Sequence, residues 1–324
     1  MMSRAPAEKF TTIDRIDDLI DAIGEHACTP GWIPRQRPIL WDRPQSAMQP
    51  MHWNYGMIRP ALQAAGRLIG TDLAERRNFV LRNPAPGNEF ATTTTLVGAY
   101  QSILPGERAR SHRHSPHALR VILEAQGAYS IVNGQKHPMD TGDIVLTPGG
   151  CWHGHVHEGA EQAYWFDCLD VPLVQLLEPM THDPHPDGWE TAAATVKRSP
   201  YLFRWADTVR RLDMLRGNGS PHFGRVLDLS SDEMPTIAIQ VHDWKAGWAN
   251  RPFRHMCNTL YVVLQGSGRS EIGELSVDWR FGDVMAAPLW CRQAHVARQD
   301  AVVVALSDQS LMKHARYYRL EDCG

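Results

Sequence analysis

The chain has 324 residues, of which 43% are hydrophobic and 21% are charged, and its formal net charge is −3. This length can hold two domains of ordinary size, each with a buried core. The nearly balanced charge, without a basic block, predicts no nucleic-acid partner. The sequence has no apolar run of about eighteen residues, so we expect no membrane span. The N-terminal residues also have no apolar segment typical of a secretory signal.

Six cysteines are widely spaced along the chain and form no CxxC pair. In a chain of this length such cysteines are typical of reduced thiols rather than of a disulfide framework. We therefore expect a cytoplasmic protein.

Two helices and an extended arm are expected before the first β-rich region. Ile13, Ile16 and Leu19 begin a helical repeat that Thr11 or Thr12 can cap, which predicts an amphipathic helix over residues 11–26. Residues 35–55 are rich in Pro, Trp and Gln and predict an extended arm that packs against another surface, plausibly a second subunit. A second helix is expected over residues 57–69.

Short β-rich runs separated by glycine turns then extend over residues 92–177. Asn133-Gly134 lies between two of them and is a strong hairpin signal. Many short strands with turn signals predict a sandwich or a barrel. Residues 178–235 interrupt the β pattern with a loop and a helix predicted over residues 203–216. The β pattern returns over residues 236–310, and a short helix is expected in the tail.

The first β-rich region carries three histidines in a metal-ligand pattern. His112 and His114 are two residues apart, so on a strand both imidazoles point to the same face. A neighbouring strand could bring His153 alongside them, and imidazole suits iron, zinc, copper and nickel. A lone His-x-His is weak support for a metal site in a chain with 16 histidines. The glycines at Gly106 and Gly150, which precede the pair and the third histidine, strengthen it.

These spacings resemble the two sequence motifs of the cupins. The glutamate that usually follows His-x-His in cupins is absent, because Leu119 and Arg120 occupy that region. The segments "PGERARSHRHSPHALRVILEAQGAYSIVNGQ" and "MDTGDIVLTPGGCWHGHVHEGAEQAYWFDCLDVPLVQLLEP" resemble the gentisate 1,2-dioxygenase family, which includes salicylate, 5-nitrosalicylate and 1-hydroxy-2-naphthoate dioxygenases. The resemblance implies an all-β-dominated bicupin fold: two double-stranded β-helix (jelly-roll) barrels with an N-terminal helical arm and a helical linker.

An internal repeat supports two barrels. "RPFRHMCNTLYVVLQGSGRSEIGE" mirrors "RSHRHSPHALRVILEAQGAYSIVNG". In this alignment Phe253 and Gln293 stand where His112 and His153 stand in the first copy, and His255 remains. We therefore expect N-terminal helices and arm at residues 1–90, a metal-binding barrel at 91–180, a linker with a helix at 181–235, and a second, metal-free barrel with the tail at 236–324.

The resemblance implies that His112, His114 and His153 bind Fe(II) without a carboxylate. The substrates would be O2 and a small aromatic acid with a hydroxyl group beside the carboxylate. The same resemblance assigns the substrate carboxylate to Arg120 and substrate binding to an arginine of the Arg76-Arg77 pair, of which the spacing to His112 favours Arg76.

Three further polar residues are assigned to the site by the resemblance. Gln101 would lie near the substrate. His155, which by spacing alone could also be a fourth ligand, would be a non-ligand histidine that hydrogen-bonds substrate or oxygen. Asp167 would support that histidine.

The expected activity is ring cleavage between the hydroxyl- and carboxyl-bearing carbons, C1 and C2, of gentisate, salicylate or a 5-substituted salicylate such as 5-nitrosalicylate. Gentisate enzymes often carry an aromatic residue near the position of Val97 and an aspartate at that of Gly154. Both changes would remove bulk or charge near the pocket and favour a broader, salicylate-type specificity. Because the family is commonly tetrameric, we also expect a homo-oligomer.

Two other functions fit a cupin barrel. A non-catalytic cupin that binds a small molecule would not need the intact set of His112, His114 and His153. A metal-dependent cupin isomerase usually keeps an acidic fourth ligand, and this chain lacks one.

Overall fold

The computed structural model describes residues 10–324 except 37, 193 and 197, and the chain forms two compact units, Met1–Arg43 and Pro44–Gly324. The first unit contains helix α2 (Ile16–Gly24) within the predicted span of residues 11–26. Several of its large apolar side chains are exposed, among them Trp32, Ile39 and Leu40. The second unit contains both barrels.

The first barrel consists of two six-stranded sheets, in the orders β13-β8-β5-β10-β3-β2 and β11-β4-β9-β6-β7-β12. The strands of the first sheet are β2 (Arg77–Val80), β3 (Val97–Ile103), β5 (Ala118–Glu124), β8 (Ile144–Thr147), β10 (Ala163–Leu169) and β13 (Leu202–Phe203). Those of the second are β4 (Arg108–His114), β6 (Ala128–Val132), β7 (Gln135–Met139), β9 (His153–His157), β11 (His182–Pro184) and β12 (Ala194–Thr195).

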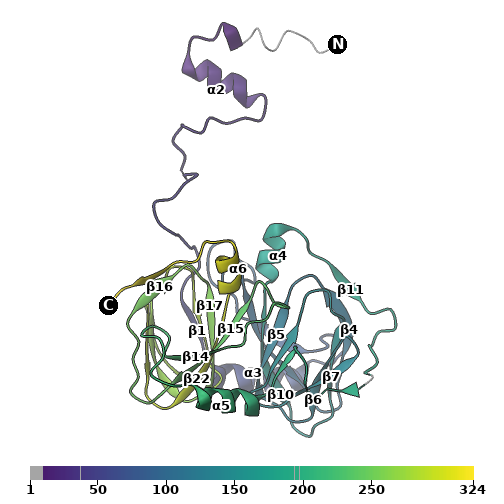
Figure 1. The fold of residues 1–324 in the computed structure, drawn as a ribbon. Coiled ribbons are helices and arrows are strands. Elements are labelled where there is room, and N and C mark those ends of the chain that lie inside the picture. The colour runs from purple at the N-terminus through teal and green to yellow at the C-terminus, as the bar shows by residue number, and fades with distance from the viewer. Residues whose placement is uncertain (1–9, 37, 193, 197) are drawn as a thin grey trace. The chain divides into compact units, whose positions relative to one another are not determined.

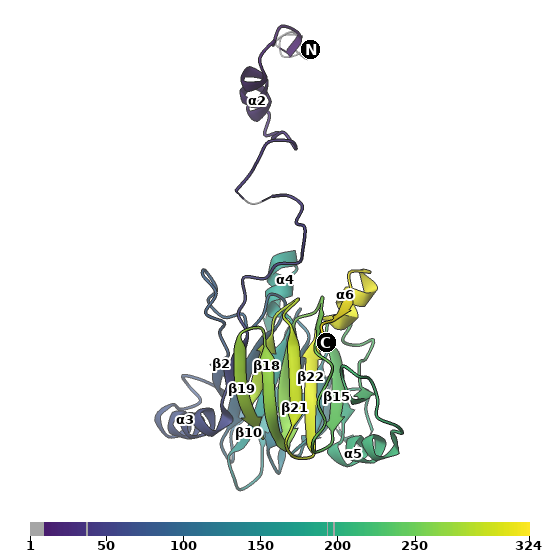
Figure 2. The same ribbon diagram turned by 90° about the vertical axis from the view of Figure 1, so that its left-hand side faces the viewer.

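The second barrel repeats this plan with sheets ordered β1-β20-β17-β22-β15-β14 and β19-β18-β21-β16-β23. The first comprises β1 (Met51–Trp53), β14 (Arg225–Asp228), β15 (Ala238–Trp244), β17 (Thr259–Gln265), β20 (Val284–Ala287) and β22 (Ala301–Ser307). The second comprises β16 (Phe253–His255), β18 (Ser267–Ile272), β19 (Leu275–Arg280), β21 (Gln293–Ala297) and β23 (Leu320–Asp322). Figure 1 shows the two barrels side by side, and Figure 2 shows strands β19, β18 and β21 face on. The predicted bicupin fold is confirmed.

The remaining helices of this unit are α3 (Tyr55–Leu68), α4 (Val171–Leu177), α5 (Trp205–Met214) and α6 (Gln309–His314). The helices predicted over residues 57–69 and 203–216 and in the tail are therefore present. The region between the barrels also contributes edge strands β11 to β14, which the sequence did not predict. These strands are two to four residues long, too short for a periodic pattern.

The arm expected at residues 35–55 does pack against another surface in its last part, but this surface belongs to the same chain and not to a second subunit. Met51 to Trp53 form β1, which pairs with β20 of the second barrel in the same chain. The backbone of Tyr55 and the ring of His52 both bond to the carboxylate of Asp283, at 2.8 and 3.0 Å.

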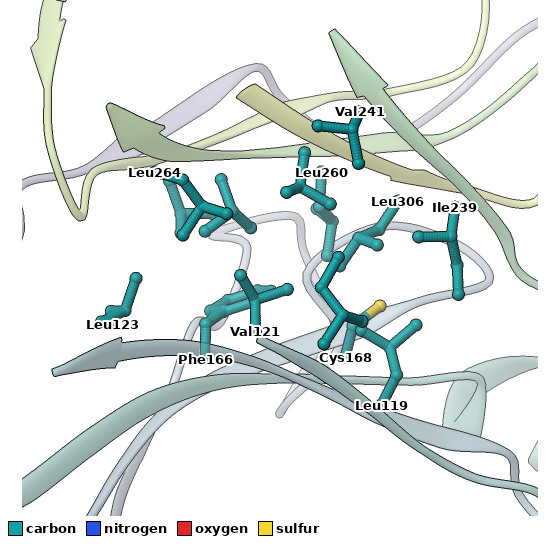
Figure 3. Close-up of a cluster of buried hydrophobic side chains, with 14 of the residues drawn as sticks. Leu119, Val121, Leu123, Phe166, Cys168, Ile239, Val241, Leu260, Leu264 and Leu306 are labelled. Atoms are coloured by element: carbon teal, nitrogen blue, oxygen red, sulfur yellow. The ribbon is translucent and has the colours of Figure 1, made fainter. Parts of the chain in front are cut away.

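A shared apolar core joins the barrels. Figure 3 shows side chains of β5 and β10 facing side chains of β15, β17 and β22, and all belong to one buried cluster. Phe166 and Leu260 are fully buried there. Gly98 on β3 must be glycine, because an added Cβ would lie 2.5 Å from the Phe166 ring.

Replacing Leu260 by alanine should lower the free energy of unfolding by about 2–5 kcal/mol, because a buried leucine leaves a cavity. Both barrels should still unfold in one transition, since the residue belongs to their common core. Urea denaturation followed by tryptophan fluorescence measures both quantities. The matched control is Leu68→Ala, whose side chain is 83% exposed and which should stay within about 0.5 kcal/mol of the parent. Two separate transitions in the parent protein would contradict a shared core.

Candidate metal centre and substrate pocket

Strands β4 and β9 bring the three predicted ligands together. The strands are antiparallel, and His112 lies directly opposite His153. The ring centroids of His112 and His114 lie 4.4 and 4.8 Å from that of His153. One ligating atom from each imidazole lies within 4.8 Å of the others, and no other set of three or more potential ligands among the described residues meets this distance. The predicted convergence of the three histidines is therefore present.

Backbone carbonyl groups orient all three imidazoles. In His112, His114 and His153 the Nδ1 atom lies 3.3, 2.8 and 3.1 Å from a carbonyl oxygen two residues away along the chain. When Nδ1–H donates to that oxygen, the lone pair on Nε2 is available to a metal ion. The donor set thus fits a divalent ion that accepts three nitrogen ligands.

The imidazoles are also held neutral. Burial lowers the pKa of His112 to about 3 and of His114 to about 4, and it places the pKa of His153 well below its ordinary value. The positive charges of Arg76 and Arg120 add to these shifts. Neutral imidazole is the ligating form, so a metal ion would not have to displace a proton at neutral pH.

Arg120 lies on β5 with 2% of its surface exposed. Its Nη1 donates to Thr147 Oγ1 at 2.7 Å, and its Nε lies 3.5 Å from Asp167 Oδ1. Burial lowers the pKa of this guanidinium to about 10, with the charge of Asp167 opposing the shift. The side chain therefore keeps its charge at neutral pH in a buried position.

The two neighbouring arginines have different surroundings. Arg77 forms an ion pair with Glu107 and donates to the carbonyl oxygen of Ile69, so its guanidinium is used inside the fold. Arg76 lies close enough to Asp167 for attraction between their charges, and its own charge lowers the pKa of His112. Arg76 is therefore the member of the pair beside the metal centre.

His155 also points into this region, beside His153, with ring centroids 6.2 Å apart. Its Nδ1 lies 2.9 Å from Ser130 Oγ, while its buried Nε2 has no hydrogen-bond partner among the described residues. Burial, reinforced by Arg120 and Arg76, holds its pKa well below the ordinary value. A neutral imidazole with a buried, unpartnered nitrogen is suited to a small bound molecule.

Asp167 contacts different groups from those expected. It accepts a hydrogen bond from Gln101 Nε2 and lies beside Arg120, whereas the side-chain partner of His155 is Ser130. Burial raises the pKa of the Asp167 carboxyl, although the nearby arginines oppose this shift. Asp167 therefore contacts Arg120 and Gln101, whereas the sequence analysis expected it to contact His155.

The sequence did not assign a role to His182. This residue lies on β11 opposite His114, and its ring stacks on His112 with centroids 5.2 Å apart. Its side chain is exposed, in a segment rich in Pro and Asp. Pairing of this short strand with β4 is what brings it to the mouth of the site.

Gly154 does not face the pocket. A Cβ at this position would lie 2.6 Å from Ser111 Oγ, on the opposite side of the sheet from the imidazoles. Ser111 Oγ in turn accepts a hydrogen bond from the backbone of Glu190. The glycine therefore allows the segment around Glu190 to lie against the barrel, and it does not enlarge the substrate pocket as we expected. Val97, the other position at which we expected less bulk near the pocket, is buried on β3.

The second barrel has a different set of side chains at the corresponding place. Phe253 and Gln293 face each other across β16 and β21, as His112 and His153 do in the first barrel. Burial lowers the pKa of its histidines, His242, His255 and His295, to about 3, 4 and 3.

Among the helices of residues 10–324 that the structure describes, none has the length and apolar character of a membrane span.

Comparison with known proteins shows which families and structures this chain resembles. A cupin-domain family model matches residues 99–171. The gentisate 1,2-dioxygenase of Ralstonia sp. is 37% identical over 238 residues, which cover 70% of this chain and 66%, just under two thirds, of that enzyme. The 5-aminosalicylate 1,2-dioxygenase of Comamonas sp. is 29% identical, with 85% and 82% covered. The structure of salicylate 1,2-dioxygenase from Pseudoaminobacter salicylatoxidans with gentisate has the same fold, with a TM-score of 0.84, 23% identity and coverages of 97% and 95%.

His112→Ala should reduce bound metal to a trace after loading with Fe(II) under anaerobic conditions, because two imidazoles remain. Inductively coupled plasma mass spectrometry of the desalted protein measures this. The matched control is His137→Ala, a buried histidine of the same barrel whose ring nitrogens already contact Gln135 and Ser199. This variant should keep the parental metal content if it folds. Stoichiometric iron in His112→Ala would refute the ligand assignment.

The protein should lose stability as the pH falls from about 7 to 5. The unfolded histidines bind protons near their ordinary pKa of 6.5, whereas buried His242, His255 and His295 do not bind them until the pH is near 3 or 4. Each such group can contribute about 1.4 kcal/mol per pH unit below 6.5. Urea denaturation across this range measures the slope. Replacing His255 by asparagine should flatten it, and an unchanged slope in that variant would count against the assignment.

Proposed function

We propose that the chain is a member of the gentisate 1,2-dioxygenase family and an Fe(II)-dependent dioxygenase that cleaves the ring of a salicylate-type acid between C1 and C2. The acid is gentisate, salicylate or a 5-substituted salicylate such as 5-nitrosalicylate. One observation carries the proposal: three neutral imidazoles, at His112, His114 and His153, lie beside the guanidinium groups of Arg76 and Arg120. A metal ion and fixed cations in one pocket suit a substrate that chelates through oxygen and carries a carboxylate.

Fe(II) held by the three histidines supplies open coordination positions for substrate and O2, together with the redox chemistry of ring cleavage. The absence of a carboxylate ligand preserves the positive charge of the site. That charge, added to those of Arg76 and Arg120, favours an anionic substrate. Relatives that carry the names gentisate and 5-aminosalicylate 1,2-dioxygenase support this substrate class.

Arg120 binds the substrate carboxylate in this proposal. A guanidinium can make two parallel hydrogen bonds to a carboxylate, and burial strengthens them because water does not compete. Thr147 Oγ1 holds one end of the Arg120 guanidinium, at 2.7 Å. Arg76, which directly precedes β2, offers a second cation.

Asp167 and Gln101 are positioning residues. The Asp167 carboxylate lies between the amide of Gln101 and the guanidinium of Arg120, so it restrains both side chains. It also compensates a buried positive charge, which would otherwise be costly before substrate binds. Gln101 Oε1 has no partner among the described residues and can accept a hydrogen bond from the substrate.

His155 contacts the substrate or oxygen through Nε2. Ser130 Oγ decides which proton this nitrogen carries: if the hydroxyl donates to Nδ1, Nε2–H is a donor, and if the hydroxyl accepts from Nδ1–H, Nε2 is an acceptor. The first form can hydrogen-bond an anionic oxygen, and the second can accept the proton of a ring hydroxyl. Both forms are neutral, as the lowered pKa requires.

Two other features support proposals about assembly and location. The exposed apolar side chains of the first unit, including Trp32 and Leu40, support a homo-oligomer, which in this family we take to be a tetramer. All six cysteines are unpaired thiols, which supports a cytoplasmic location.

Protein loaded with Fe(II) without oxygen should consume O2 when given gentisate, salicylate, 5-nitrosalicylate or 1-hydroxy-2-naphthoate, with loss of the aromatic absorption band. An oxygen electrode and a spectrophotometer, used on the same four compounds in parallel, give the rates and their rank order. Protein that has never been loaded with metal is the control. Bound iron without O2 uptake on any of the four would reject ring cleavage and favour a binding protein.

Arg120→Ala should retain iron but lose carboxylate capture. Charge-assisted hydrogen bonds contribute about 1.5–3 kcal/mol each, so kcat/KM should fall by about 10-fold or more per bond, chiefly through KM. Steady-state O2 uptake against substrate concentration gives both constants, and metal analysis checks the ligands. Arg82→Ala, at an exposed arginine, is the matched control and should leave both constants unchanged. An unchanged KM in Arg120→Ala would refute its role.

A further inference from the structure

The second barrel contains buried polar side chains that the proposed reaction does not use. His242, His255, Gln293 and His295 are at most 3% exposed. Each carries a polar atom without a hydrogen-bond partner among the described residues: both ring nitrogens of His242, Nδ1 of His255, Nε2 of Gln293 and Nε2 of His295. Buried polar groups in folded proteins nearly always have partners, so four such residues in one place need an explanation.

Aromatic rings connect these side chains into one cluster. The Tyr261 ring lies 5.0 Å from the His295 ring and 6.3 Å from the His242 ring. The Phe223 ring lies 6.0 Å from His242 and 6.3 Å from His255. The unpartnered nitrogens therefore belong to one region of the barrel interior.

Gln293 belongs to the same region through Tyr261. The Tyr261 hydroxyl donates to Gln293 Oε1 at 2.7 Å, which leaves the amide nitrogen as the unused end of the side chain. The carbonyl oxygen of Phe223 lies near His242 and opposes the lowering of its pKa, but it already accepts from Trp244 Nε1 at 2.8 Å. Within the described part of the chain, no atom has hydrogen-bond geometry to the unpartnered nitrogens of His242 and Gln293.

The cluster occupies the place of the catalytic pocket in the repeat. Tyr261 lies opposite Ala305, as Arg120 lies opposite Asp167 in the first barrel. Tyr261 thus places a phenol at the position of Arg120, and Ala305 places a methyl group at that of Asp167. The buried pocket has therefore lost its charged pair.

Hydrogen-bonding groups remain at this place although the charges are gone. His295 Nδ1 lies 2.8 Å from Ser270 Oγ, as His155 Nδ1 lies 2.9 Å from Ser130 Oγ. His242 stands opposite Val303 on β22, at the position that Gln101 occupies in the first barrel. The second barrel thus keeps a polar interior without a site for an anion.

The chemistry of these groups defines what could satisfy them. The three imidazoles are neutral, so each has one N–H donor and one acceptor nitrogen. His242 has both nitrogens unpartnered, whereas His255 and His295 each have one, because Thr259 and Ser270 contact the other, and Gln293 adds its N–H donors. None of these four side chains carries a charge that could compensate a charged guest. Their ring nitrogens also do not converge as the ligating atoms of the first barrel do, since only that set meets the distance expected of a metal site among the described residues.

We propose that the interior of the second barrel is a binding site for a small uncharged molecule that both donates and accepts hydrogen bonds and bridges His242, His255, Gln293 and His295. Water has this chemistry, and a small neutral alcohol or phenol shares it. The site is separate from the dioxygenase pocket and does not depend on its activity.

The first test is the sign of a stability change. His242→Leu removes an imidazole that has no partner within the chain. If a guest bridges the cluster, the variant leaves the guest and the other three side chains without a bond, and Tm should fall by about 2–4 °C or more. If there is no guest, replacing an unsatisfied buried group by an apolar one should raise Tm, which would overturn the proposal.

Two controls keep this result interpretable. His137→Leu removes a buried histidine whose ring nitrogens both have partners in the chain, so it should lower Tm in either case and calibrates the size of the effect. Iron content and O2 uptake of His242→Leu should match the parent, because the residue lies outside the first barrel.

The second test applies to the unmodified protein and does not depend on a variant that folds. A crystal structure of the iron-loaded protein should contain density within hydrogen-bond distance of His242 and Gln293. Side chains that bond directly to one another, with no density between them, would overturn the proposal. Mass spectrometry of an extract of the unfolded protein separates the two sources: a stoichiometric neutral compound identifies an organic guest, and its absence beside such density identifies water.

Discussion

The pairing of β4 with β9 is the constraint on which the candidate site depends. It places His112 opposite His153, and the two-residue period of a strand adds His114 and His155 to the same interior face. A shift of one residue would turn the imidazoles outward. Turns at Gly106 and Gly150, both with positive φ, and the hydrogen bond from the backbone of Gly150 to the carbonyl oxygen of His114 fix that register.

The electrostatics of the pocket follow from this packing. Three imidazoles beside two guanidinium groups would repel one another if protonated, so burial and arginine charge together keep them neutral. Asp167 is the acidic group that contacts Arg120, and it stands against the arginine rather than among the ligands. The carboxylate thus lies against the arginine proposed to bind substrate and not among the three histidines.

The sequence predicted the features that have a period or a spacing. The β-rich regions, the helices α3 and α5, and the convergence of His112, His114 and His153 follow from such patterns, whereas the bicupin fold was implied by the family resemblance and supported by the internal repeat. It did not predict His182 beside His112, because a three-residue edge strand has no pattern of its own. The direction of Gly154 was misjudged for a related reason: proximity to a ligand in sequence does not mean that a side chain shares its face.

The two barrels share one architecture but differ in the charged side chains of their interiors. Both keep the contact between a serine hydroxyl and a buried histidine, at Ser130–His155 and Ser270–His295. What differs is charge: Arg120 and Asp167 are matched by Tyr261 and Ala305. Since both barrels share one apolar core, the second barrel can stabilise the sheet that carries Arg120, and without this charged pair it would not compete for the anionic substrate proposed above.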